Sequence, residues 1–193
     1  MKQDIVLAGV GGQGILTIAY IIDNTAQRSG LQFKQVEVHG MAQRGGAVVS
    51  HVRLSDQAIF SDLIPKGAAD LILSVEPLEA LRYIDFLAPE GTVVTSINPY
   101  DNIPDYPDII KVRDAVKEIS RHVFVDSGEL SGEAGSSKSQ NMVMLGAASR
   151  FLVLKEKVLL ESIEELFKVK GDQVIDINKK AFRLGKKAAE NSK

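Results

Sequence analysis

The residues best suited to chemistry lie near the start of the chain, in a glycine-rich segment. Gly9, Gly11 and Gly14 have the spacing G-x-G-x-x-G, directly after the apolar run at residues 5–8 and directly before a helical pattern. Glycines there allow a tight turn and a close approach to the backbone, while free N–H groups at a helix start favour an anion. The segment therefore predicts a binding edge, whose occupant is a dinucleotide, another phosphate compound or a partner chain; an empty structural turn is the remaining alternative.

A second glycine-rich segment follows at residues 39–46 and contains Arg44, Gly45 and Gly46. Small residues beside an arginine let the backbone approach a ligand next to a guanidinium fork. The alternative is a long hairpin turn with a solvated arginine. A nucleotide-binding βαβαβ unit would have a helix in this place. The sequence has only a loop, so we expect the strand at 33–38 to turn back into an antiparallel neighbour at 47–54.

Glu37 is the residue on which an NAD(P)-binding interpretation depends. It lies near the end of the second predicted strand, roughly where a dinucleotide fold places its ribose-binding carboxylate, ~20 residues after the glycines. A solvated acid at a strand end is the other interpretation. An NAD(P)-dependent oxidoreductase using Gly9, Gly11, Gly14 and Glu37 is therefore the alternative function.

The sequence predicts no catalytic residue and no metal site in this chain. It has no cysteine, which excludes a cysteine nucleophile, a thiolate zinc site and a cysteine-ligated iron–sulfur cluster. It has no G-x-S-x-G motif, and no Walker lysine accompanies the first glycine loop. The three histidines lack metal-type spacing, and we interpret His51, in a predicted strand, as a structural residue. A chain with a place to bind and no evident means of catalysis is typical of a subunit.

The elements that must position these residues form an alternating pattern. We predict strands at residues 5–8, 33–38, 47–54, 71–75, 92–97, 109–112 and 122–125, and helices at 15–28, 77–87, 113–121, 141–154, 157–168 and 173–191. Residues 126–140 are poor in apolar side chains and suit a mobile loop or a segment ordered against a partner. The expected fold is α/β, a Rossmann-like mixed sheet flanked by helices with a C-terminal helical extension. We expect one domain over 1–193, with a sheet core at about 3–125 and a helical tail at about 141–193.

Composition sets the class of protein. The chain has 193 residues, 45% hydrophobic and 25% charged, with a formal net charge of −2. That charge argues against nucleic acid as a partner. We find no signal segment at the N-terminus and no apolar run near the ~18 residues of a membrane helix, so we expect a cytoplasmic protein without a membrane partner.

Two separated motifs resemble a known family. The segment Gly9-Val-Gly-Gly-Gln-Gly14 after a strand, followed by Met41-Ala-Gln-Arg-Gly-Gly46 and the strand at 47–53, is similar to the gamma domain of the 2-oxoacid:ferredoxin oxidoreductases. The resemblance extends to the helix start at Asn141 and to the C-terminal helices. The form of the second motif resembles the small (beta) subunit of the indolepyruvate branch.

The resemblance implies a division of labour between subunits. A large alpha subunit would carry thiamine diphosphate, magnesium and [4Fe–4S] clusters, oxidise an indolepyruvate-type 2-oxoacid to an acyl-CoA and reduce ferredoxin. This chain would be the accessory subunit, binding no cofactor by itself and inactive alone. Coenzyme A (CoA) would be a shared ligand. Its implied contacts here are Gly9, Gly11, Gly12, Gln13, Gly14, Arg44, Gly45 and Gly46.

Overall fold

A computed structural model describes residues 1–39, 45–101 and 103–191, the side chain of His39 excepted. Within these residues six strands form one mixed sheet in the order β2-β3-β1-β4-β5-β6. The strands are β1 (Lys2–Val10), β2 (Gln32–His39), β3 (Ala47–Ser55), β4 (Ala69–Ser74), β5 (Leu87–Ser96) and β6 (His122–Val125). The fold is α/β, as predicted.

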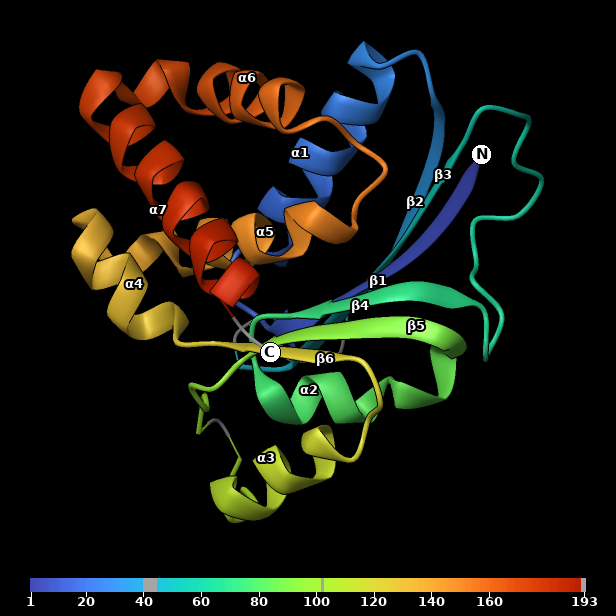
Figure 1. The fold of residues 1–193 in the computed structure, drawn as a ribbon, viewed down its shortest axis with the longest axis vertical. Helices are drawn as coiled ribbons and strands as arrows, with labels where there is room; N and C mark the ends of the chain where they lie inside the picture. Colours follow the sequence, from blue (N-terminus) through green and yellow to red (C-terminus); the bar gives the residue numbers. More distant parts are fainter. Residues whose placement is uncertain (40–44, 102, 192–193) are drawn as a thin grey trace.

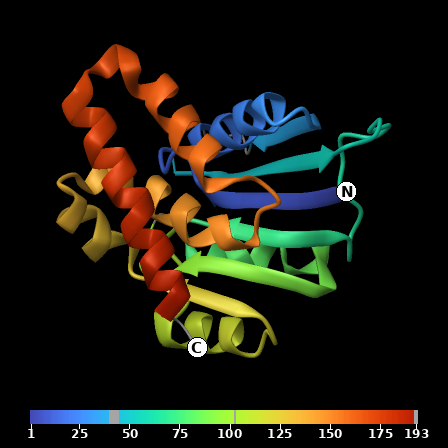
Figure 2. The same cartoon turned by 45° about the horizontal axis from the view of Figure 1, so that its top comes forward.

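The helices form a layer on each face of the sheet (Figures 1 and 2). They are α1 (Ile15–Arg28), α2 (Pro77–Arg82), α3 (Ile109–Lys117), α4 (Ser127–Ala134), α5 (Gln140–Ala148), α6 (Glu156–Phe167) and α7 (Asp172–Asn191). The larger hydrophobic core lies between the sheet and the layer of α1, α5, α6 and α7. A smaller core lies under α2. The predicted helical extension is therefore one covering layer of the sheet.

The first strand is the centre of the sheet. β1 pairs with β3 in the antiparallel sense and with β4 in the parallel sense. Residues 3–10 are buried, as expected for a strand with both faces covered. β3 also pairs antiparallel with β2, which confirms the predicted hairpin. The helix α1 therefore starts at the carboxyl end of the central strand, next to the point where the sheet changes direction.

Two segments differ from the sequence-based expectation. Residues 109–112, predicted as a strand, begin α3. The Asp108 side chain accepts a hydrogen bond from the Ile110 N–H at 2.8 Å, and Val112 and Val116 are buried one helical turn apart. Residues 127–134, predicted as part of a loop, form α4, where the Asp126 side chain accepts a hydrogen bond from the Glu129 N–H at 2.9 Å. Capping by an aspartate starts both helices.

Two predicted helices are also longer than the observed ones. The helix expected over 77–87 ends at Arg82 and is followed by a 3₁₀ turn, Ile84–Phe86, and by the start of β5 at Leu87. The helix expected over 141–154 ends at Ala148, after which a 3₁₀ turn leads to an extended Leu152. The helical spacing of apolar residues continues beyond the end of each helix, but in the structure the chain turns there through a 3₁₀ segment.

A glycine pair lets α5 and α7 cross closely. A Cβ atom on Gly146 would lie 1.9 Å from the Phe182 carbonyl oxygen, and one on Gly185 would lie 1.9 Å from the Val143 carbonyl oxygen. Phe182 is fully buried at the crossing. The contact fixes α7 over α5, and through α5 it positions the residues that reach the glycine loop.

A candidate binding site at the glycine loop

The first glycine segment forms a tight loop between β1 and α1. A Cβ atom on Gly9 would lie 2.6 Å from Ile15 Cδ1 and 2.9 Å from Gln13 Oε1, so a larger residue there would require these two side chains to shift. Gly12 and Gly14 have φ values of 104° and 78°, a region that side chains disfavour. The Gln13 side-chain oxygen accepts a hydrogen bond from the Val10 N–H at 2.8 Å. Gln13 therefore holds the loop's own shape through its oxygen.

Backbone hydrogen bonds join the two glycine segments. The Gly11 N–H donates to the Gly46 carbonyl at 2.9 Å, and the Gly45 N–H donates to the Gly11 carbonyl at 3.4 Å. These bonds extend the β1–β3 pairing beyond its last pair, Val10 with Ala47. The structure thus brings together the predicted residues Gly9–Gly14 and Gly45–Gly46. Arg44 lies outside the described residues.

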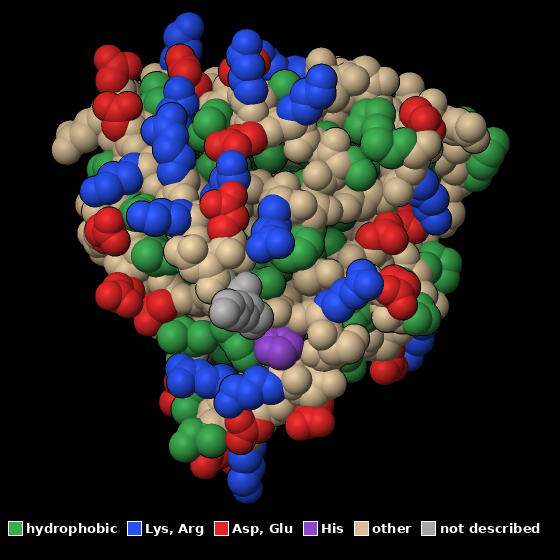
Figure 3. All heavy atoms as spheres, viewed as in Figure 1, with side chains coloured by type: hydrophobic (Ala, Val, Ile, Leu, Met, Phe, Trp, Pro, Cys, Tyr) green, Lys and Arg blue, Asp and Glu red, His purple; other side chains and the backbone are tan. Residues whose placement is uncertain are grey.

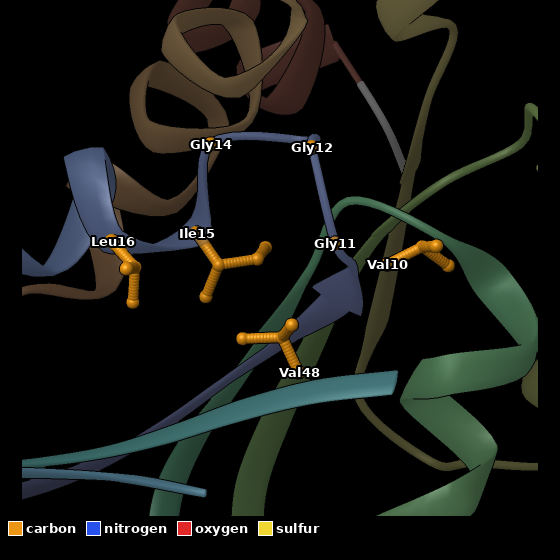
Figure 4. A pocket seen from close by; sticks show the side chains of 7 residues that line it. All are labelled: Val10, Gly11, Gly12, Gly14, Ile15, Leu16 and Val48. Atoms are coloured by element: carbon orange, nitrogen blue, oxygen red, sulfur yellow. The ribbon is translucent and has the colours of Figure 1, made fainter. Parts of the chain in front are cut away.

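An apolar cavity of about 280 Å³ opens beside the loop. Gly11, Gly12 and Gly14 form its wall, and Figure 4 shows the side chains of Ile15 and Val48 pointing toward each other below them. Leu16 lines the same cavity and is 44% exposed. The cavity can accept an uncharged, narrow group next to bare backbone.

Asn141, at the start of α5, is a site residue that the chemical reasoning from sequence did not select. Its side-chain amide donates to the Gly14 carbonyl at 3.3 Å, and its own oxygen accepts from the Met142 N–H. A Cβ atom on Gly14 would lie 2.4 Å from the Asn141 amide nitrogen. The polar run before an apolar helix was the available signal, but the contact spans 127 residues of sequence.

A second cavity, of about 430 Å³, lies on another side of the loop. Its walls come from the loop, the start of α1, the connection between α4 and α5, and the segment from the end of α6 into α7. The residues that line it are Gly12, Gln13, Gly14, Thr17, Ser136, Lys138, Ser139, Asn141, Phe167, Lys170, Val174, Ile177 and Asn178. We call this the polar cavity. Gly12 and Gly14 line both cavities.

Glu37 is on a strand that is not adjacent to the central strand, whereas the NAD(P) interpretation requires the two strands to be neighbours. It pairs with Ser50 of β3, and β3 lies between β2 and the central strand that carries the glycine loop. Its carboxylate accepts a hydrogen bond from the Gln35 side chain at 2.6 Å. The strand order gives no support to the alternative that combines Glu37 with Gly9, Gly11 and Gly14.

Two other titratable side chains are buried in the sheet layers. Burial, with a smaller contribution from the Glu37 carboxylate, raises the pKa of Asp23 on α1 to about 7. Burial lowers the pKa of His51, whose Nδ1 accepts a hydrogen bond from the Ile64 N–H at 3.1 Å. The His51 ring also packs edge-on against Phe86. These contacts support the interpretation of His51 as a structural residue.

The donor set of the described residues does not fit a metal or a cluster. No group of three His, Cys, Asp or Glu side chains in the described ranges can hold a metal ion. The sequence has no cysteine to ligate iron. Among the helices of the described part, none combines the length and apolar character that crossing a bilayer requires.

Comparison with known sequences assigns the chain to a family. The sequence profile of the family described as pyruvate ferredoxin/flavodoxin oxidoreductase matches residues 4–188. The chain is 39% identical to the indolepyruvate oxidoreductase subunit IorB of Thermococcus kodakarensis, with 98% of each chain covered. It is 37% identical to the IorB subunit of Pyrococcus horikoshii, again with 98% of each chain covered.

Solved structures share the fold. The 2-oxoglutarate:ferredoxin oxidoreductase of Magnetococcus marinus, with 2-oxoglutarate, coenzyme A and succinyl-CoA bound, superposes with a TM-score of 0.79 at 24% identity, covering 98% of this chain and 31% of that one. The pyruvate oxidoreductase subunit PORC of Thermotoga maritima superposes with a TM-score of 0.75 at 22% identity, covering 100% and 97%. The chain belongs to the pyruvate ferredoxin/flavodoxin oxidoreductase family.

Proposed function

We propose that this chain is the accessory subunit of a 2-oxoacid:ferredoxin oxidoreductase of the indolepyruvate type, acting in the cytoplasm. The full-length similarity to IorB subunits supports the assignment to this branch. The complex would convert a 2-oxoacid to an acyl-CoA and pass the electrons to ferredoxin. The accessory role agrees with a site built from backbone groups and side-chain amides.

The partner would be a large alpha subunit that holds thiamine diphosphate, magnesium and [4Fe–4S] clusters. These groups supply carbanion stabilisation and electron transfer. This chain's own residues would bind and orient the acyl acceptor. A cysteine-free chain is consistent with clusters lodged in another polypeptide.

The observation that carries the proposal is the joining of the two glycine segments through Gly11, Gly45 and Gly46. It produces an edge without bulky side chains, beside an apolar cavity and at a helix start that favours an anion. We propose that Gly9, Gly11, Gly12, Gln13, Gly14, Gly45 and Gly46, with Arg44, face CoA at this edge. The relative with bound CoA is compatible with this ligand.

Reconstitution tests the proposal directly. The chain is purified alone and together with the large alpha subunit of an indolepyruvate oxidoreductase, and indolepyruvate-dependent reduction of ferredoxin is followed with and without CoA. We expect activity only from the complex, and we expect it to require CoA. Turnover of a 2-oxoacid by the isolated chain with NAD as acceptor would contradict the proposal.

A further inference from the structure

The connection between β3 and β4 carries two exposed large apolar side chains on one short loop. Phe60 is 94% exposed and Leu63 is 56% exposed. We call residues 56–63 the Phe60 loop. Figures 1 and 2 show this connection beside the N-terminus, projecting past the sheet, and Figure 3 shows hydrophobic side chains that protrude on that side of the molecule. Apolar residues that gather on the surface in this way are typical of a contact with another protein.

Hydrogen bonds from Arg53 on β3 hold the Phe60 loop in place. Its guanidinium donates to the carbonyl groups of Ser61 and Leu63 at 3.0 and 3.1 Å. The same guanidinium forms a bidentate ion pair with Asp4 on β1, at 2.8 and 3.1 Å, and the Asp4 side chain is 1% exposed. The loop is thus fixed to the sheet on both sides of Phe60. An aromatic side chain on a pre-ordered loop suits protein binding, because little entropy is lost on contact.

A cavity of about 270 Å³ opens directly beside Phe60. The Phe60 ring forms one wall, and Leu54, Ala58 and Ile59 contribute apolar atoms to the others. A benzene ring needs a cavity of roughly 150 Å³, so one aromatic side chain fits here. The surface therefore has a protruding ring and a hole for a ring side by side.

The charged groups around this surface are paired with one another. The N-terminal amine of Met1 lies 2.6 Å from the Asp56 carboxylate. The Lys34 ammonium lies 2.8 Å from the Asp62 carboxylate, in addition to the arginine ion pair described above. A surface with an excess of one sign would repel an identical surface. This one presents compensated charges, so a second copy of the chain meets no excess of like charge.

The Phe60 loop and the glycine loop lie at opposite ends of β1. Lys2 pairs with Ser55, directly before the Phe60 loop, and β1 ends at Val10, directly before the glycine loop. The eight residue steps from Lys2 to Val10 span ~26 Å. A protein bound at the Phe60 loop therefore leaves the proposed CoA edge accessible to the large subunit.

We propose that two copies of this chain associate through the Phe60 loop, in an isologous contact with two-fold symmetry. In such a contact the same surface of each copy meets the other, so each Phe60 ring enters the cavity of the opposite copy. A ring and a hole that lie side by side allow both insertions about one axis. This association goes beyond the proposed function and depends neither on the ligand nor on the reaction.

Sedimentation velocity of the full chain, over a concentration series up to millimolar, tests the association. We expect a reversible dimer for the wild type and at least a tenfold weaker dimer Kd for Phe60→Ser. Val169→Ser is the matched control and should dimerise as the wild type does. Val169 is 91% exposed and lies in the turn between α6 and α7, which Figures 1 and 2 show on the other side of the molecule. A wild type that is monomeric at every concentration, or equal Kd values for the wild type and Phe60→Ser, would overturn the proposal.

Covalent cross-linking identifies the surface that forms the contact. Gln57→Cys places a single thiol near the expected two-fold axis, since the sequence has no cysteine. A short bismaleimide should give a covalent dimer of Gln57→Cys and none of Val169→Cys. Ala58→Trp fills the cavity beside Phe60 and should weaken the dimer as strongly as Phe60→Ser. Equal cross-linking at both positions, or an Ala58→Trp dimer as tight as that of the wild type, contradicts the ring-in-cavity contact.

Co-purification distinguishes a second copy from the large subunit as the occupant of this surface. Phe60→Ser should still form the complex with the large subunit, because the glycine loop at the other end of β1 is unchanged. Loss of the variant from that complex would show that the large subunit covers the Phe60 loop, and the proposal would be wrong. Because the Phe60 side chain is almost fully exposed, the melting temperature of the monomer should not change in Phe60→Ser.

Discussion

Asp23 on α1 carries a buried carboxyl group whose pKa is raised by its surroundings. Asp23 is 7% exposed, and one of its carboxylate oxygens is buried without a hydrogen-bond partner in the described structure. Burial raises its pKa to about 7, and the Glu37 carboxylate adds to the shift. The protonated form is therefore favoured in the folded state well above the ordinary value of 3.8.

The Asp23 pKa predicts how stability depends on pH. Because the folded state holds this proton more tightly than the unfolded state, the contribution of Asp23 is most favourable below pH ~4 and declines as pH rises to about 7. Asp23→Asn should flatten this decline and raise the free energy of unfolding at pH 8 by more than ~1 kcal/mol. Urea unfolding between pH 4 and 8 measures the free energy of unfolding of the wild type and the variant. Asp176→Asn, at an exposed position, is the control. An unchanged pH slope in Asp23→Asn would refute the assignment.

At the residue scale the sequence predicted the loop but only part of its surroundings. Local spacing was sufficient for Gly9, Gly11 and Gly14, because a tight turn and positive φ are local demands. Asn141 could not be selected in this way. Its importance arises from a contact across 127 residues of sequence, which spacing along the chain does not record.

The crossing of α5 and α7 decides stability at the scale of the elements. Gly146→Ala would place a methyl group 1.9 Å from the Phe182 carbonyl oxygen, and only a helix shift can relieve that overlap. We expect a loss of at least ~2 kcal/mol in the free energy of unfolding, since overpacking of a rigid core is costly. Thermal or urea unfolding of the variant measures this effect.

Gly132→Ala is the matched control for the crossing. Gly132 lies inside α4, and a Cβ atom there would meet nothing within 4 Å. Alanine is the better helix former by up to ~1 kcal/mol, so this variant should be neutral or slightly stabilised. Equal losses in Gly146→Ala and Gly132→Ala would show that the close crossing is not the cause.

Element prediction failed where small or β-branched residues dominate. Residues 109–112 are rich in β-branched side chains, yet the Asp108 cap and the buried positions Val112 and Val116 make them helical. α4 buries only Ser127, Ser131 and Ala134, a set with almost no apolar signal. Its Asp126 and Glu129 were the recognisable start signal. The alternating strands, by contrast, were predicted because their burial follows directly from apolar runs.

At the scale of the whole molecule the chain has the fold of the pyruvate oxidoreductase subunit PORC, in line with the family to which its sequence belongs. β3 runs antiparallel to β1 and lies where a dinucleotide-binding fold would have a parallel strand. That residues 1–193 form one domain stays a prediction, as do the CoA contacts, including Arg44. The compartment and the partner likewise depend on the proposed function.

Ligand-induced stabilisation distinguishes the two ligands for the full chain. CoA at ten times its Kd should stabilise the folded state by ~1.4 kcal/mol, because it binds only that state. For a chain of this size that corresponds to a rise in Tm of about 3–6 °C. NAD and NADP at the same concentration should give no rise. A rise with NAD and none with CoA would reverse the assignment.

The bracing of the glycine loop has a consequence for synthesis on the ribosome. The loop lies at residues 9–14, yet the groups that hold it are the Gly46 carbonyl and the Asn141 amide. A nascent chain therefore emerges with this loop held only by its internal hydrogen bonds, and the loop gains its last contact only after Asn141 has left the exit tunnel. Any fragment that stops before that point contains the whole motif but lacks the contact from Asn141.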